Sequence, residues 1–70
     1  MKRLTGRELA RLLESHGWTL LRIRGSHHIY GKTGHRARIS IPIHGNRPLR
    51  AGLQNHLVSV AGLSTADLER

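Results

Sequence analysis

The N-terminal part of the chain has the pattern of apolar and polar positions that is typical of an amphipathic helix. Its apolar stripe recurs at helical spacing and consists of Leu9, Leu12 and Leu13. Thr5 followed by Glu8 has the spacing of a capping box, in which each side chain bonds the backbone N–H of the other residue. Gly17 can adopt the left-handed conformation that ends a helix. The pattern predicts a helix over residues 5–16.

Three segments rich in β-forming residues follow, at 18–23, 27–30 and 36–41. A tight turn at Gly25 and Ser26 separates the first two segments, and a second turn over 32–35 separates the last two. In the third segment apolar and polar residues alternate, and Pro42 closes it. The sequence therefore predicts two consecutive hairpins that form an antiparallel meander.

The C-terminal part predicts a loop over residues 43–48 and then a second helix. Apolar residues recur there at helical spacing, at Leu49, Leu53, Leu57 and Val60. Gly62 ends this helix, which we expect over 49–61, and Ser64 with Asp67 predicts a short final turn. The order α-β-β-β-α predicts an α+β fold of two layers, a three-stranded antiparallel sheet with two helices on one face.

Trp18 and Tyr30 are the only aromatic residues besides histidine, and we expect both in the core rather than as platforms for stacked bases. Ile29 and Tyr30 point to opposite faces of their strand, because side chains alternate along a strand. Whichever of the two is buried decides the face from which His27 projects. The sequence leaves that choice open.

Charge is distributed unevenly along the chain. Its 70 residues, which we expect to form a single domain over 1–70, include 12 Lys and Arg against 4 Asp and Glu, a formal net charge of +8. No carboxylate lies between Ser15 and Ala66, yet this stretch holds all six histidines. Such a field attracts a polyanion, most commonly a nucleic acid, or an acidic protein. No apolar run approaches the ~18 residues of a membrane span, so we expect no membrane partner and a cytoplasmic protein.

Several function classes are excluded by residues that the sequence lacks. Without cysteine it has no disulfide framework, no thiolate zinc site and no thiol nucleophile. It has no glycine-rich phosphate-binding loop, no HExxH zinc motif and no carboxylate pair near the histidines. His27 and His28 point to opposite faces of a strand, so they cannot bind one metal ion together. We expect neither a metal nor another cofactor.

Histidine in a cationic setting suits one reaction in particular, the metal-free cleavage of RNA. A neutral imidazole can remove the proton of a 2′-OH, and the alkoxide then attacks the adjacent phosphate. Arginine or lysine nearby would stabilise the charge of the transition state. The products would be a 2′,3′-cyclic phosphate and a 5′-OH. His44, His28 and Lys32 are candidates for protonating the departing oxygen, and the sequence alone does not rank them or choose the base among six histidines.

Four segments, in order and covering nearly the whole chain, resemble the HicA family of toxins from toxin–antitoxin pairs. The first is Arg24-Gly25-Ser26-His27-His28-Ile29-Tyr30, which follows a Ser-His-Gly-Trp segment. The others are Ile39-Ser40-Ile41-Pro42-Ile43-His44, Arg47-Pro48-Leu49-Arg50-Ala51-Gly52-Leu53 and Ala61-Gly62-Leu63. The segment 31–35 is shorter than in many members and lacks their proline.

The resemblance implies a fold similar to the double-stranded-RNA-binding domain and an mRNA interferase that inhibits translation until an antitoxin binds it. It implies that His27, the histidine directly after Gly-Ser, is catalytic. We take His44 and His28 as accessory acid/base candidates. We expect RNA contacts from Arg24, Gly25, Ser26, Lys32, Arg38 and Arg47. Gly25 would let a phosphate approach closely. The implied partners are an mRNA substrate and an acidic, dimeric antitoxin of the HicB type.

Two other functions fit the same charge. The first is a non-catalytic RNA-binding domain of the same fold. A DNA-binding module ranks last, because the segment that enters the final helix is not preceded by a helix-turn-helix. Loss of RNA cleavage on replacing His27 would separate an enzyme from a binding module, and an all-deoxyribose substrate would separate RNA cleavage from DNA binding.

Overall fold

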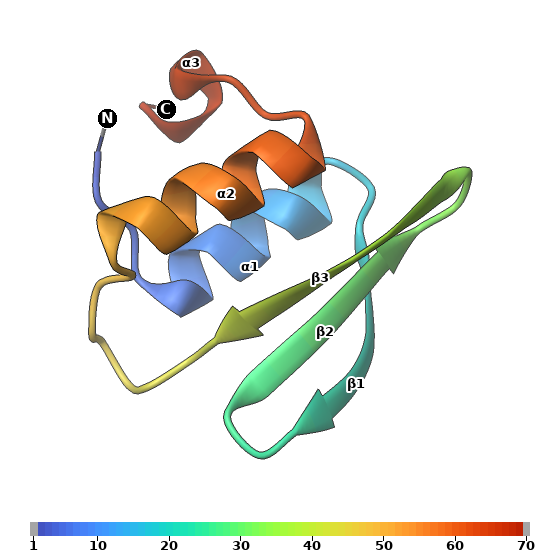
Figure 1. Cartoon of the computed structure of the whole chain (residues 1–70), viewed down its shortest axis with the longest axis horizontal. Coiled ribbons are helices and arrows are strands. Elements are labelled where there is room, and N and C mark those ends of the chain that lie inside the picture. The colour runs from blue at the N-terminus through green and yellow to red at the C-terminus, as the bar shows by residue number, and fades with distance from the viewer. Residues whose placement is uncertain (1, 70) are drawn as a thin grey trace.

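A three-stranded antiparallel sheet with two helices on one face forms the structure, a computed structural model that describes residues 2–69. In chain order the elements are α1 (Gly6–Ser15), β1 (Thr19–Arg24), β2 (His27–Lys32), β3 (His35–Pro42), α2 (Ala51–Ala61) and α3 (Thr65–Leu68). The strands lie in the order β1-β2-β3, and α1 and α2 cover the same face of the sheet (Figure 1). The predicted α+β fold and its element order are confirmed.

The local signals at the ends of α1 act as predicted. The backbone N–H of Glu8 donates to Thr5 Oγ1 at 3.1 Å, and the N–H of Thr5 donates to Glu8 Oε1 at 2.8 Å. The bond from the Thr5 backbone lowers the pKa of the Glu8 carboxyl, because it favours the charged form. Gly17 follows the helix with φ of 92°. The predicted helix is correct to within one residue at each end.

The core lies between the sheet and the two helices. Its fully buried large side chains include Leu9, Leu13, Ile39, Ile41 and Gln54. Trp18 and Tyr30 are buried among them, which confirms that both belong to the core. Tyr30 also donates its hydroxyl proton to Glu14 Oε2 at 2.9 Å, so the middle of β2 is tied to α1.

The second helix differs from the prediction in its start and in its buried face. It begins at Ala51 rather than at Leu49, because the N–H of Leu49 donates to the carbonyl of Leu4 at 2.7 Å and pairs the chain with the N-terminal segment. Leu53, predicted to face the core, is exposed, whereas Gln54 is only 1% exposed. Gln54 Oε1 accepts from the N–H of Leu4 at 2.8 Å, and its Nε2 donates to the carbonyl of Lys2.

Gly6 lets the start of α1 lie directly against the end of β3. A Cβ at this position would overlap the carbonyl oxygen of Pro42 and lie 3.0 Å from Ile43 Cγ1. The carbonyl belongs to the backbone of the sheet, so it cannot move aside as a flexible side chain can. Gly52, on the first turn of α2, has open space at the same position.

These two glycines give opposite expectations for substitution by alanine. We expect Gly6→Ala to lower the free energy of unfolding by about 1–3 kcal/mol, because the added methyl group forces α1 and β3 apart. Gly52→Ala should instead raise it by about 0.5–1 kcal/mol, because alanine favours the helix and meets nothing. Urea unfolding of both variants measures the difference. Equal changes in the two proteins would contradict the close packing at Gly6.

Burial and the neighbouring carboxylate of Glu14 raise the pKa of Tyr30 to about 12. Because the pKa of Tyr30 in the folded protein lies above the unfolded value of about 10, protonated Tyr30 stabilises the folded state. This stabilisation is complete below pH 10 and is lost as the pH rises through about 12. The chain has one tyrosine, so tyrosinate absorbance reports this group directly. In Glu14→Gln the midpoint should fall but stay above 10, because burial is the larger cause. A wild-type midpoint near 10 in the folded protein would contradict the burial.

Candidate functional site

The burial of Tyr30 answers the question of which face carries His27. Tyr30 points to the helices, so His28 also lies on the helix side and His27 projects from the opposite, open face of the sheet. His27 is exposed and begins β2, where it pairs with Arg24 on β1 and with Pro42 on β3. Directly paired residues share a face, so Arg24 lies beside His27 on the open face.

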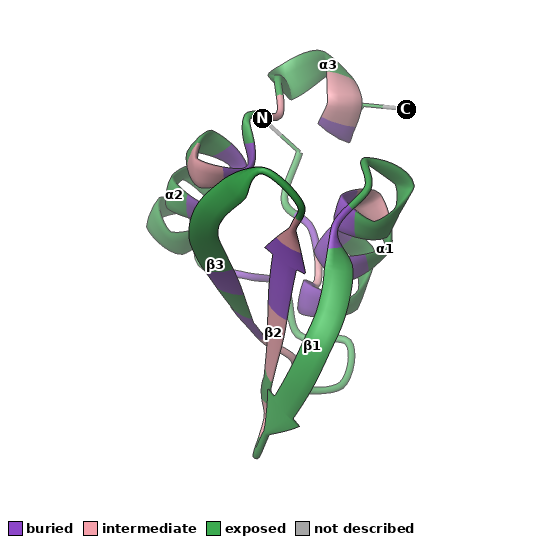
Figure 2. Cartoon of the chain, turned by 90° about the vertical axis from the view of Figure 1, so that its right-hand side faces the viewer, coloured by how far each residue is buried: buried purple, intermediate pink, exposed green. Residues whose placement is uncertain are grey.

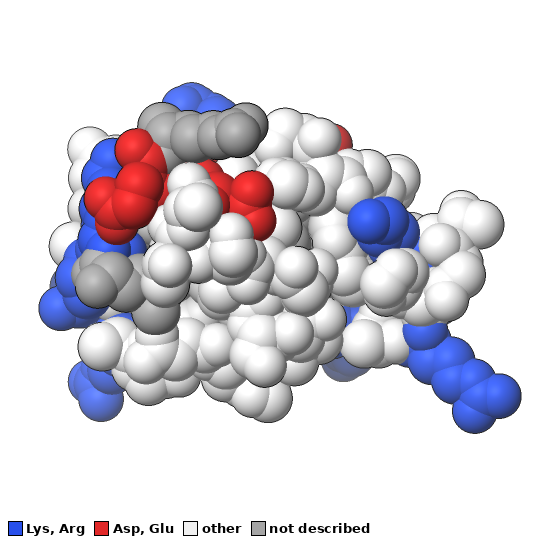
Figure 3. Space-filling model, turned by 90° about the horizontal axis from the view of Figure 1, so that it is seen from above, with Lys and Arg blue, Asp and Glu red and all other residues white. Residues whose placement is uncertain are grey.

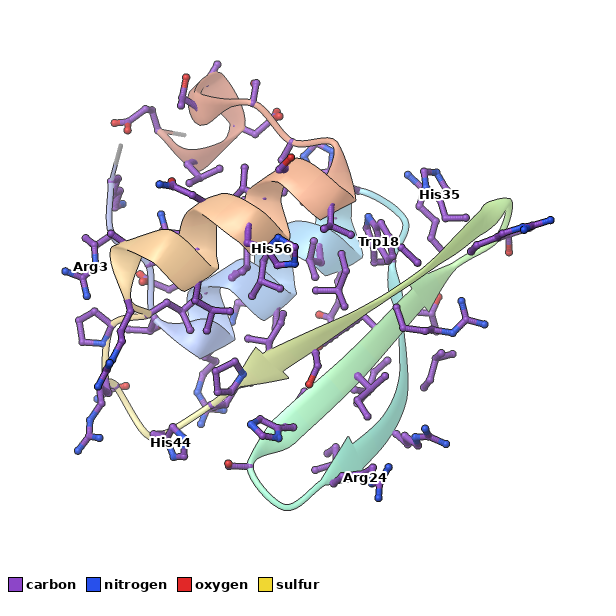
Figure 4. All side chains as sticks on the ribbon, viewed as in Figure 1. Arg3, Trp18, Arg24, His35, His44 and His56 are labelled. Carbon is purple, nitrogen blue, oxygen red and sulfur yellow. The ribbon has the colours of Figure 1, made fainter. Side chains whose placement is uncertain are left out.

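The turn before His27 touches the segment that follows β3. Gly25 has φ of 60°, which a tight turn between β1 and β2 requires, and Ser26 is the other turn residue. The carbonyl of Ser26 accepts a hydrogen bond from the N–H of Ile43 at 2.8 Å. His44 therefore follows a residue that is fastened to the turn preceding His27. Figure 4 shows His44 and Arg24 at the same end of the sheet.

A pocket of about 250 Å³ adjoins this end of the sheet. His44, Arg47 and Arg50 line it, together with the apolar side chain of Leu53 and with Pro42, the β3 partner of His27. We call the five residues at this end of the sheet the His27 cluster: Arg24, His27, His44, Arg47 and Arg50. The two predicted accessory groups lie in different places, because His44 lines this pocket and His28 does not.

His28 lies in a different environment, between the sheet and α1. It is half-buried and lines a groove of about 240 Å³ together with Arg7, Leu20 and Tyr30. His28 and His27 point to opposite faces, so the two imidazoles cannot act on the same phosphate from one side.

Lys32 and Arg38 lie toward the other end of the sheet, where they line a pocket of about 480 Å³ with His35. Lys32 Nζ is 5.9 Å from the centroid of the Trp18 ring, and the His35 ring centroid is 5.4 Å from that of Trp18. We call Lys32, His35 and Arg38 the hairpin-end cluster. Figure 4 shows His35 and His44 at opposite ends of the sheet.

The two clusters are separated by about half the length of β3. Arg38 precedes Pro42 by four residues, which corresponds to about 13 Å along an extended strand. This separation exceeds the Debye length of about 8 Å at physiological ionic strength, so exposed charges in the two clusters interact only weakly. The six predicted RNA contacts therefore divide into one group beside His27, made by Arg24, Gly25, Ser26 and Arg47, and a second made by Lys32 and Arg38.

No carboxylate lines the pocket of the His27 cluster, since the four acidic residues lie on α1 and on or directly after α3. Figure 3, which shows the molecule from above, has most of its red acidic side chains at the left, beside blue lysine and arginine side chains. One histidine does meet an acid, since His16 Nε2 lies 3.7 Å from Asp67 Oδ1. Within residues 2–69, no three histidine or acidic side chains are grouped so that they could bind a metal ion.

Arg50 and Arg22 are two further cations that were not among the six predicted RNA contacts. Arg50 lines the pocket with His44 and Arg47 and caps the start of α2 without a side-chain hydrogen bond. Arg22 pairs with Ile29 and so lies on the open face near Arg38, with which it lines a shallow depression. Strand alternation counted from Arg24 would have indicated the face of Arg22.

Comparison with models of known protein families identifies the family of the chain. The family model described as the HicA toxin of bacterial toxin–antitoxin pairs matches residues 6–63, which includes both clusters. The chain belongs to the HicA toxin family. It is therefore a toxin of a toxin–antitoxin pair, and a cognate antitoxin is its partner.

A search of curated protein sequences gave no significant match to this HicA toxin. No helix within residues 2–69 has the length and apolar character needed to span a membrane.

Proposed function

We propose that this HicA toxin is a metal-independent endoribonuclease that cleaves mRNA in the cytoplasm, with His27 as the general base. The observation that carries the proposal is the position of His27, exposed on the open face beside Arg24 and joined through Pro42 to the pocket of His44 and Arg47. An exposed imidazole among cations can reach a phosphodiester that the cations hold. Membership of a family known for toxins that cleave mRNA supports the same reaction.

The reaction uses the 2′-OH of the RNA as nucleophile. The His27 imidazole accepts the 2′-OH proton while the oxygen forms a bond to phosphorus. Arg24 and Arg47 bind the phosphate oxygens, on which negative charge grows in the transition state. The bond between phosphorus and the 5′ oxygen then breaks, and His44 supplies a proton to that oxygen. The products are a 2′,3′-cyclic phosphate and a 5′-OH, and no metal ion takes part.

The proposed antitoxin is acidic, dimeric and of the HicB type, and it inhibits the toxin by covering the His27 cluster. The absence of carboxylates between Ser15 and Ala66 supports an acidic partner. Lys32 and Arg38 hold a more distant part of the RNA, because Arg38 lies about 13 Å along β3 from Pro42, the partner of His27.

Replacing His27 tests the catalytic proposal. We expect His27→Ala to lower the rate of cleavage of a long single-stranded RNA in excess EDTA by about 10²–10⁴-fold, because the general base is lost. The matched control is His56→Ala, which removes another exposed histidine, on α2, and should leave the rate unchanged. Denaturing gels measure the rate, and end-group analysis should show cyclic phosphate.

A substrate with deoxyribose at every position should bind but resist cleavage, since it lacks the nucleophile. Equal cleavage by wild type and His27→Ala would remove His27 from the mechanism. Binding of RNA by both proteins without cleavage would favour the non-catalytic RNA-binding domain instead.

The two basic clusters predict different kinetic effects. Arg47→Ala should lower kcat/KM by about 10–100-fold and mainly through kcat, because it removes a charged contact to the reacting phosphate. Arg38→Ala should instead raise KM and leave kcat nearly unchanged, because its contact is the same in substrate and transition state. Steady-state kinetics on one RNA of defined length separates the two effects. If both variants changed only KM, Arg47 would not contact the reacting phosphate.

A further inference from the structure

β1 exposes apolar side chains that the RNA chemistry does not use. Leu20, Leu21 and Ile23 are 39%, 51% and 53% exposed, and the only other exposed large apolar side chain within residues 2–69 is Leu53 on α2. All six residues of β1 are exposed, as Figure 2 shows by its uniform green colour. Neighbouring exposed apolar side chains of this kind are typical of a protein interaction surface.

β1 is also an edge of the sheet. The strand order β1-β2-β3 leaves β1 with a neighbouring strand on one side only, and β1, unlike the other edge strand β3, has no buried residue. An edge strand offers unpaired backbone N–H and C=O groups to which an extended segment of another chain can add as a further strand.

The apolar side chains lie on both faces of this edge. Leu20 and Ile23 pair with Tyr30 and His28, so they lie on the helix side of the sheet. Leu21 is the extra residue of a β-bulge, and its Cδ1 lies near Gly31 on the open face. An added strand would therefore cover apolar groups with its side chains on each face.

A groove beside β1 adds space for such side chains on the helix side. It has a volume of about 240 Å³ and lies between α1 and β1. Ala10, Leu20 and Tyr30 supply apolar walls, and α1 supplies two positive charges, Arg7 and Arg11, against the one carboxylate of Glu14, which accepts from the Tyr30 hydroxyl. The groove thus suits apolar side chains that are accompanied by carboxylates.

Charge decides which chain can occupy the edge. A second copy pairing β1 with β1 would bring Arg22 and Arg24 close to the same residues of a chain that also carries a net charge of +8. RNA has no apolar side chains that would cover Leu21 and Ile23. A segment with apolar and acidic residues satisfies both the exposed apolar groups and the two arginines.

We propose that β1 is the docking strand for the antitoxin, an extended segment of which adds to it as the fourth strand of the sheet. The apolar side chains of this segment cover Leu20, Leu21 and Ile23, and its carboxylates pair with Arg22 and Arg24. The proposal rests on the acidic antitoxin proposed above and on no ribonuclease activity, so it is tested with an inactivated toxin.

The test measures binding of the purified cognate antitoxin to the His27→Ala chain. In that background, the double substitution Leu21→Thr with Ile23→Thr should weaken binding at least about tenfold, because threonine keeps the strand but removes apolar contact. Arg22→Glu should weaken it to a similar extent. Arg36→Glu on β3 is the matched control, since it makes the same change in net charge on an exposed strand residue, and it should weaken binding less than about threefold.

Hydrogen exchange distinguishes an added strand from contact by side chains alone. On binding, amides of β1 that exchange rapidly in the free toxin should become protected. No protection in β1, or equal weakening by Arg22→Glu and Arg36→Glu, would overturn the docking proposal. Binding that resists both charge reversals and high salt would contradict the acidic antitoxin itself. Each variant is first shown by circular dichroism to unfold cooperatively like its parent.

Self-association is measured on the same proteins. Sedimentation should show a monomer for the toxin without antitoxin, and the double threonine variant should not change this. A dimer that dissociates on Leu21→Thr with Ile23→Thr would overturn the proposal in favour of pairing between two copies.

Discussion

The burial of Tyr30 is the constraint on which the rest of the site depends. Because side chains alternate along β2, a Tyr30 that faces the helices sends His28 to the same side and His27 to the open face. A slip of one residue in the register would exchange the two histidines. The register is held by the pairing of Tyr30 with the buried Ile39 and by its hydrogen bond to Glu14. Core packing thus selects the histidine that can meet a ligand.

The loop 43–50 that carries Arg47 and Arg50 is held at both ends by backbone hydrogen bonds. Ile43 donates to the turn before His27, and Leu49 donates to the carbonyl of Leu4, while Arg3 Nε donates to the carbonyl of Leu49 at 2.7 Å. Gln54 ties the N-terminal segment to α2, because its side chain accepts from the N–H of Leu4 and donates to the carbonyl of Lys2. A loop without regular structure is therefore positioned before any ligand arrives, which lowers the entropy lost when a phosphate binds.

The sequence predicted the structural features that depend on residues close together in the chain and missed those that depend on residues far apart in the chain. The ends of α1 followed from a capping box and a left-handed glycine, both local signals. The start of α2 and the burial of Gln54 depend on residues 2–4, about 50 positions away, and no local pattern indicates them. His27 was expected from the family resemblance, but the face of the sheet on which it lies could be settled only from the burial of Tyr30 in the core. The distance of Lys32 and Arg38 from the His27 cluster follows from the length of the strands. The exposure of β1 follows from its position at the edge of the sheet.

A toxin with this charge would attract RNA and the proposed acidic antitoxin through the same field, so charge alone discriminates poorly between them. Salt screens the contribution of phosphates and of exposed carboxylates alike. Burial of Leu20, Leu21 and Ile23 is not screened by salt, and only a protein partner supplies apolar side chains for it. On the proposed arrangement, the apolar edge of β1 therefore gives the antitoxin an advantage over RNA that grows as ionic strength rises. The edge strand would then hold the antitoxin beside the open face, where it covers the His27 cluster.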